Sequence, residues 1–216
     1  EIQIMDEDLQ TREEHLAMLA ENLPRKVGKL SSRFDRALQL AGDPDVEGET
    51  ADEIRSLTDD VASLSAGIST ADGRKPDYLV IEERHQRLAE EVAQVHTLAT
   101  EQKQEMNDLR TNIPQLADGY NKWVVAIRNF ANDPDVRLYT ETWNDIKRLQ
   151  SYELELAPDR QGLRDQQKHL KKLIRYANRL MSQAEEEADE DGPLLATAKF
   201  VGGVAALVIG IDILDD

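Results

Sequence analysis

The chain has 216 residues, 32% of them charged and 5% aromatic, and it carries a formal net charge of −17. A nucleic-acid-binding protein needs clustered Lys and Arg to neutralise phosphates, so we expect no nucleic-acid partner. The absence of Cys excludes disulfide scaffolds and zinc sites with thiolate ligands. Because 40% of the residues are hydrophobic, the chain can bury a core and a wholly disordered protein is not expected.

The first 41 residues predict one long amphipathic helix. Its apolar positions recur at helical spacing and therefore lie on one face of the helix. They are Ile2, Met5, Leu9, Leu16, Leu19, Leu23, Val27, Leu30, Phe34, Ala37 and Ala41. Gly42 follows as a helix stop, and Pro44 prevents the helix from continuing.

An acidic loop comes next, with the sequence Asp43-Pro44-Asp45-Val46-Glu47-Gly48-Glu49. Carboxylates at loop positions 1, 3 and 5, with Gly at position 6, are similar to the start of a calcium-binding EF-hand loop. Asp43, Asp45 and Glu47 are therefore a candidate Ca²⁺ site, although position 12 is Ile54 instead of Glu. The alternative is an acidic turn between two helices, and we expect no resident metal or other cofactor.

A short helix is predicted over residues 51–67, with Thr50 as its N-cap. A loop over residues 69–76 separates it from a heptad pattern that begins at residue 81 and predicts a long helix. The heptad positions are Ile81, His85, Leu88, Val92, Val95, Ala99, Gln102, Met106, Leu109, Ile113, Leu116, Tyr120, Trp123, Ile127 and Phe130. Only His85 and Gln102 are polar, and His85 suits a register-setting position in a bundle core. The stripe can pair within one chain or between chains.

Two more helices are expected, over residues 141–157 and 161–187, and no strand is expected. Thr140 is the predicted N-cap of the first. Trp143, just after a loop, is a candidate contact surface because aromatic side chains anchor interfaces.

The second of these helices holds the one basic stretch of the chain, residues 168–176, which includes Lys171, Lys172 and Arg175. These cations are a candidate surface for an acidic partner or for anionic lipid. The alternative is that they pair with the acidic faces of neighbouring helices.

The C-terminal segment changes in composition. Six of the seven residues 185–191 are acidic, and Gly192-Pro193 separates them from an apolar run. The candidate membrane-contacting residues are Leu194, Leu195, Phe200, Val201, Val204, Leu207, Val208, Ile209 and Ile211. The 19 residues 193–211 approach the roughly 20 that a transmembrane helix needs. The segment is interpreted as a membrane anchor, as one arm of a membrane-inserting hairpin, or as a helix buried in the bundle.

Two helix-breaking motifs recur at a separation of 90 residues. Asn22-Leu23-Pro24 recurs as Asn112-Ile113-Pro114, and Asp43-Pro44-Asp45-Val46 recurs as Asp133-Pro134-Asp135-Val136. The coincidence indicates an internal repeat. We expect two helical units, residues 1–103 and 104–190, followed by an acidic Gly-Pro hinge and apolar tail over residues 191–216. Pro24 and Pro114 are expected to kink their helices or to mark joints.

The long–short–long order of helices over residues 1–190 resembles a spectrin-type repeat array. The resemblance implies three-helix units of about 90 residues, in which the last helix of one unit continues as the first helix of the next. Residues 76–131 would be that shared helix. A long antiparallel helical hairpin or bundle of another kind is the alternative. The predicted fold class is all-α, an elongated antiparallel helical bundle or coiled coil with an apolar C-terminal helix.

No nucleophile motif or phosphate-binding glycine loop occurs in the sequence, so an enzyme is not expected. The predicted function is a non-catalytic structural or tethering scaffold that binds protein partners through its helical surfaces and a membrane through residues 193–211. Membrane association with most of the chain in water is the expected location, and self-association stays open. The alternatives are an α-helical pore-forming toxin component and a soluble adaptor with the tail packed in its core.

Overall fold

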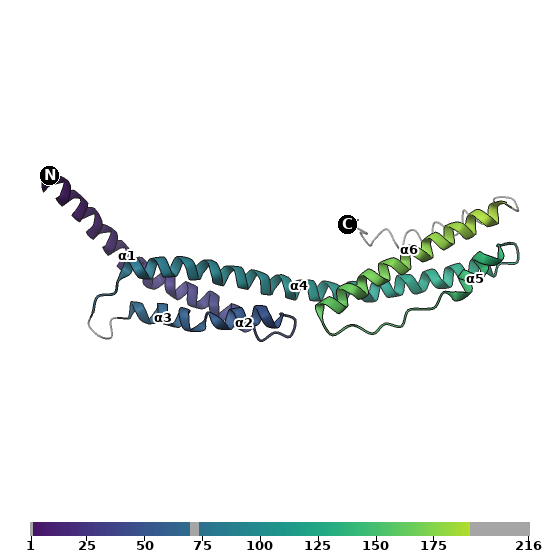
Figure 1. The fold of residues 1–216 in the computed structure, drawn as a ribbon, viewed down its shortest axis with the longest axis horizontal. Coiled ribbons are helices and arrows are strands. Elements are labelled where there is room, and N and C mark those ends of the chain that lie inside the picture. Colours follow the sequence, from purple (N-terminus) through teal and green to yellow (C-terminus); the bar gives the residue numbers. More distant parts are fainter. Residues whose placement is uncertain (1, 70–73, 191–216) are drawn as a thin grey trace. The chain divides into compact units, whose positions relative to one another are not determined.

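The computed structural model describes residues 2–69 and 74–190 (Figure 1). These residues form α-helices and no strand, which confirms the predicted all-α class. In chain order the helices are α1 (Ile2–Leu40), α2 (Gly48–Ser56), α3 (Thr58–Ile68), α4 (Tyr78–Ala131), α5 (Thr140–Arg148) and α6 (Arg160–Glu190). The chain divides into two compact units between Glu105 and Met106, so α4 contributes residues to both.

The first unit buries one face of each of its helices in a single apolar core. Most of these side chains come from α1 and the first part of α4, and α2 and α3 complete the core. The core residues are Leu19, Leu23, Val27, Leu30, Phe34, Ala37, Ala41, Val46, Ala51, Ile54, Val61, Leu64, Ile81, Leu88, Val92 and Ala99. The predicted helix over residues 51–67 is present as α2 and α3, which meet at Leu57.

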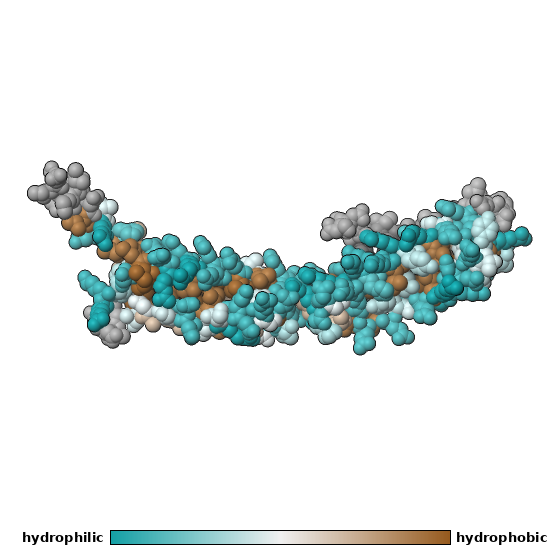
Figure 2. Space-filling view, viewed as in Figure 1, coloured by the Kyte–Doolittle hydropathy of each residue, from teal (hydrophilic) through white to brown (hydrophobic). Residues whose placement is uncertain are grey.

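The second unit has its own core between the later part of α4, α5 and α6. Its largest fully buried side chains include Ile113, Ile127, Ile146, Leu163 and Leu170. The residues Tyr120, Ile127 and Phe130 of the heptad stripe are buried in this core, and Trp123 is partly buried against it. The visible face of the helices is mostly hydrophilic, with hydrophobic residues showing between them (Figure 2).

The helix expected over residues 141–157 is wrong in its second half. The helix α5 ends at Arg148, and residues 149–157 contain no helix. The segment 151–156 alternates polar and apolar residues with the period of two that an extended chain favours, and Pro158 lies two residues beyond it. Asn121 of α4 fixes this segment, because its side-chain amide donates to the Tyr152 carbonyl (3.1 Å) and accepts from the Tyr152 amide (2.7 Å).

The N-caps predicted for the short helices are also wrong. Glu47 and Tyr139 are the N-cap residues of α2 and α5, and both have extended backbone. Thr50 and Thr142 stand three residues further on, and both are buried. The two short helices therefore correspond at an offset of 92 residues, two more than the Asp-Pro-Asp-Val loops that precede them. The two extra residues lie between the loop and the helix in the second unit.

The longer helices begin with aspartate caps that the sequence analysis did not single out. Asp77 accepts a hydrogen bond from the Val80 amide (3.3 Å) at the start of α4, and Asp159 accepts one from the Gly162 amide (2.8 Å) at the start of α6. Both follow the N-cap pattern in which a short polar side chain binds an amide of the first turn. A Cβ at Gly162 would stand 2.8 Å from the Cβ of Ala157, so the close return of the chain requires glycine there.

Pro24 and Pro114 lie inside α1 and α4, and both helices continue through them. An internal proline removes a helical hydrogen bond and costs about 3 kcal/mol unless packing compensates. The preceding residues, Leu23 and Ile113, are completely buried in the two cores. Core packing therefore holds each helix together at its proline, and the division between the units lies at residues 105 and 106 instead of at Pro114.

Candidate functional site

A partly buried polar cluster fixes the start of α2, the middle helix of the first unit. Gln102 of α4 is 2% exposed and donates to the Thr50 hydroxyl (2.9 Å) and to the Glu47 carboxylate (3.2 Å). Its side-chain carbonyl accepts from the backbone amide of Glu47 at 3.0 Å. We call Gln102, Thr50 and Glu47 the first polar cluster. It satisfies a helix-terminal amide that would otherwise need water.

The second unit has a corresponding cluster built from different residues. Gln183 of α6 donates to the hydroxyl of Thr142 (2.8 Å) and to the carboxylate of Glu187 (3.0 Å). The Thr142 hydroxyl donates to Glu187, and the backbone amide of Tyr139 donates to the same carboxylate at 3.0 Å. We call Gln183, Glu187, Thr142 and Tyr139 the second polar cluster.

The charge of Glu187 depends on these neighbours. Burial alone would raise the pKa of Glu187, but the hydrogen bonds from Thr142, Gln183 and the Tyr139 amide outweigh that effect and lower it. Hydrogen bonds to a carboxylate favour its charged form. The second polar cluster therefore holds an ionised carboxylate at the start of α5, where the positive end of the helix dipole also favours it.

The candidate calcium residues Asp43, Asp45 and Glu47 lie in the loop before α2, but their contacts are structural. The Asp43 carboxylate accepts from Lys103 of α4 at 2.5 Å and from the backbone amide of Asp45 at 3.0 Å. That hydrogen bond and the charge of Asp43 raise the pKa of Lys103. Glu47 belongs to the first polar cluster. Within residues 2–69 and 74–190 no group of three or more His, Asp or Glu side chains is placed to hold a metal ion.

The second copy of the loop repeats its backbone geometry. The Asp135 amide donates to the Asp133 carboxylate at 3.0 Å, and the Val136 amide donates to the Asp133 carbonyl at 3.1 Å. The equivalent bonds in the first copy are 3.0 Å and 3.2 Å long. Because both copies close the same turn, the shared Asp-Pro-Asp-Val motif is explained by turn chemistry.

Trp143 is half-buried on α5, at the position that corresponds to the buried Ala51 of α2. Its ring packs against the second core, and the ammonium of Lys147 stands 4.9 Å from the ring centroid. The predicted contact residue thus lies on the core-facing side of its helix. It is too large to be covered there, which leaves part of the ring accessible.

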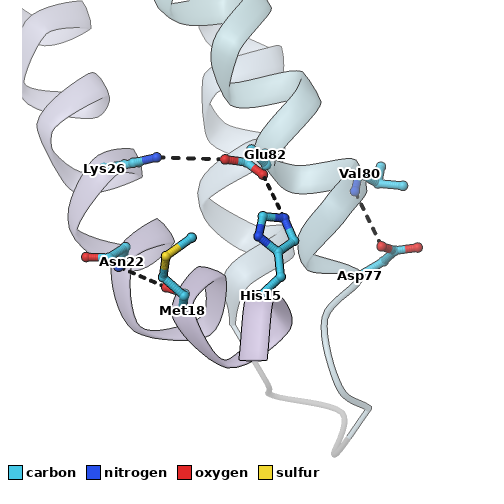
Figure 3. A network of polar contacts seen from close by, with 7 residues as sticks. All are labelled: His15, Met18, Asn22, Lys26, Asp77, Val80 and Glu82. Atoms are coloured by element: carbon cyan, nitrogen blue, oxygen red, sulfur yellow. Dashed lines mark hydrogen bonds and ion pairs between the residues drawn. The ribbon is translucent and has the colours of Figure 1, made fainter. Parts of the chain in front are cut away.

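His85 of α4 is half-buried near Lys26 of α1. Burial lowers its pKa below the usual 6.5, the Lys26 backbone acts in the opposite direction, and the Lys26 charge lowers the pKa further. Glu82, one turn earlier, stands 3.8 Å from the Lys26 ammonium and 4.0 Å from His15 (Figure 3). This network fastens the start of α4 to α1.

The basic stretch of α6 is exposed to solvent over most of its length. Lys172 and Arg175 are exposed, and Lys171 is half-buried. Together with His169, Leu173, Tyr176, Asn178 and Arg179, Lys172 and Arg175 line a shallow groove along the helix. No ion pair joins Lys171, Lys172 or Arg175 to any acidic residue in the described part of the chain. The expected alternative, pairing with neighbouring acidic faces, is therefore not realised there.

The candidate membrane residues between Leu194 and Ile211 lie outside the described residues. None of the helices within residues 2–69 and 74–190 is long and apolar enough to cross a membrane. Comparison of the chain with protein-family models, with curated proteins and with solved structures found no match.

Proposed function

We propose that this chain is a non-catalytic tethering scaffold of two spectrin-like helical units, attached to a membrane through residues 193–211. The observation that carries the proposal is the pair of separate helical cores, each with a polar cluster that fixes its middle helix. Both clusters and both Asp-Pro-Asp-Val loops use their polar groups to hold helices in place. The charged outer faces of the helices are then available to protein partners.

The membrane part of the proposal rests on the sequence of the tail. Its apolar run is long enough to reach across most of the hydrocarbon core, and it follows an acidic stretch that would stay in water. The described helices bury most of their large apolar side chains in the two cores, and their exposed hydrophobic residues, such as Leu9 and Val125, form no run comparable in length to the tail sequence.

The test is liposome flotation of residues 1–216 and of a chain that ends at Asp191, with dye release recorded in the same samples. We expect only the longer chain to float, without dye release. A matched pair of full-length variants separates hydrophobicity from length. Val204→Arg with Leu207→Arg places two charges in the tail and should abolish flotation. Leu154→Arg with Leu156→Arg makes the same change at exposed positions of the second unit and should leave flotation intact.

The other outcomes each overturn the proposal. Flotation accompanied by dye release would instead support a pore-forming component with a membrane-inserting segment. If neither chain floats, the tail belongs to the bundle core or to a protein interface. Loss of thermal stability in the shorter chain would then support the soluble adaptor.

A further inference from the structure

The second unit has a cavity of about 350 Å³ between α4, α6, the end of α5 and the extended segment that follows it. Three tyrosines and two leucines are among its lining residues. They are Tyr120, Leu149, Tyr152, Leu173 and Tyr176. We call this space the tyrosine cavity. Its volume lies near the lower end of the range for ligand sites, so it suits one large side chain and not a folded element.

The tyrosine cavity has a polar group to offer. Tyr120 is 3% exposed, and its hydroxyl makes no hydrogen bond to any residue in the described part of the chain. Burial raises the pKa of Tyr120, so the hydroxyl stays protonated and can donate. A hydroxyl at a buried position usually has a partner, and a ligand in the cavity can supply one. Asp145 and Arg148, which also line the cavity, form an ion pair with each other at 3.4 Å.

The tyrosine cavity continues into the groove along α6, because Leu173 and Tyr176 line both. We call this groove the α6 groove. Lys172, Arg175 and Arg179 also line it, at spacings of three and four residues that keep them on one side of the helix. All three are exposed, and no ion pair joins them to an acidic residue within residues 2–69 and 74–190. Positive charge without a counter-charge in those residues thus lies beside a largely apolar cavity.

The first unit has a groove of similar charge on α1, which we call the α1 groove. Its lining residues are Arg25, Gly28, Lys29, Ser32, Arg33 and Arg36, and none of them is aromatic or aliphatic. A ligand that needs only positive charge should therefore use both grooves. A ligand that must also bury an aromatic side chain should select the α6 groove.

We propose that the second unit binds a short acidic peptide with one aromatic residue, whose ring enters the tyrosine cavity while its acidic residues contact Lys172, Arg175 and Arg179. Aromatic side chains seated in pockets are typical anchors of protein interfaces. A peptide contacts the groove alone, whereas a flat anionic membrane would also meet Glu186, which is exposed about two turns beyond Arg179. The proposal rests on the scaffold function, since the peptide belongs to a protein partner, but it does not involve the tail.

The test is fluorescence anisotropy of a labelled synthetic peptide, one Tyr flanked on both sides by Glu residues, added to the full chain in non-ionic detergent. We expect saturable binding at about 0.1 M salt that weakens as added salt screens the exposed charges. Replacing the Tyr of the peptide by Ser should raise the dissociation constant by about tenfold or more, because burial of the ring is lost. Equally tight binding of the peptide with Ser would overturn the proposal.

Two kinds of variant locate the bound peptide. Lys172→Glu with Arg175→Glu should weaken binding by at least about tenfold, because like charges then face each other. The matched control is Lys29→Glu with Arg33→Glu, the same change in the α1 groove, which should leave binding unchanged. Tyr120→Phe removes only the hydroxyl and should weaken binding about threefold. Equal losses in the two groove variants would show that charge alone attracts the peptide and would contradict the proposal.

Absence of saturable peptide binding would also overturn the proposal. If vesicles containing phosphatidylserine then float the chain that ends at Asp191, and Lys172→Glu with Arg175→Glu abolishes this flotation, the α6 groove contacts a membrane instead. Peptide binding and flotation through the tail are measured separately, so the failure of one leaves the other standing.

Discussion

The two units begin their middle helices, α2 and α5, with equivalent residues after the N-cap, but different side chains hold the two helix starts in place. In the first unit, Gln102 contacts the helix start directly, and its amide serves both the buried Thr50 and the N-cap backbone. In the second unit, Gln183 reaches Thr142, but the N-cap amide binds the carboxylate of Glu187. A buried threonine three residues after the N-cap is common to both. In both units the backbone amide of the N-cap residue needs a hydrogen-bond acceptor, and either a side-chain amide or a carboxylate can supply it.

The two units differ more in how the chain returns from the middle helix. The first unit continues as a helix through α3, whereas the second becomes extended after Arg148. The extended segment is held by Asn121 and by Gln166, whose amide donates to the Tyr152 hydroxyl (3.1 Å) and to the Glu155 carbonyl (2.6 Å). Side-chain amides thus replace the backbone bonds that a helix would have made.

The largest expected effect tests whether the middle helices occupy equivalent positions. Ile54 and Ile146 each stand seven residues after an N-cap, and both are almost completely buried. Ile54→Ala and Ile146→Ala should each lower the free energy of unfolding by about 2–5 kcal/mol, since each leaves a cavity in a packed core. Chemical denaturation measures both. If the free energy of unfolding fell by less than about 1 kcal/mol in one variant alone, Ile54 and Ile146 would not occupy equivalent positions.

The next effect should be confined to the second unit. Asn121→Ala removes both hydrogen bonds to Tyr152 and should cost about 1–3 kcal/mol, because two partly buried backbone groups lose their partner. The Tyr152 amide should also lose protection from hydrogen exchange. Asn178→Ala, at an exposed position of α6, is the matched control and should have little effect. Unchanged protection at Tyr152 in the Asn121 variant would contradict the role given to this side chain.

A smaller effect should appear in the first unit as the pH falls. Burial lowers the pKa of His85, so the unfolded chain binds a proton more readily than the folded one. The stability that neutral His85 preserves is complete above its usual pKa of 6.5 and declines as the pH falls through the lowered folded value. His85→Gln should flatten the dependence of the melting temperature on pH between pH 7 and 5. An unchanged slope would exclude His85 as its source.

The smallest expected effect belongs to the second unit and lies at lower pH. The hydrogen bonds that lower the pKa of Glu187 stabilise the folded state above the usual value of 4.5. This contribution is lost as the pH falls through the lowered folded pKa. Glu187→Gln should therefore remove part of the acid sensitivity of the second unit below pH 4.5. The effect is modest because Glu187 is only partly shielded from water. Acid denaturation of the unaltered chain and of Glu187→Gln measures it, and equal acid sensitivity of the two would contradict the role given to this carboxylate.

The all-α class was predictable because apolar spacing reports the buried face of a helix directly. The heptad stripe from Ile81 to Phe130 lies within α4. The polar clusters were not predictable, because Gln102 registered only as a break in that stripe and Gln183 gave no signal. Packing brings Gln102 to Thr50 across 52 residues of sequence and Gln183 to Thr142 across 41 residues. The alternation of polar and apolar residues over 151–156 did carry a signal for the extended segment, which the sequence analysis did not use.

The central claim is that a glutamine from a long helix fixes the middle helix of each unit through a buried threonine. A pair of double-mutant cycles tests it most directly. One combines Gln102→Ala with Thr50→Val, and the other combines Gln183→Ala with Thr142→Val. We predict a coupling free energy of about 0.5–3 kcal/mol in both units, because the side chains of each pair are in contact. Coupling in only one unit, or in neither, would contradict the conclusion that both middle helices are fixed by a glutamine from a long helix.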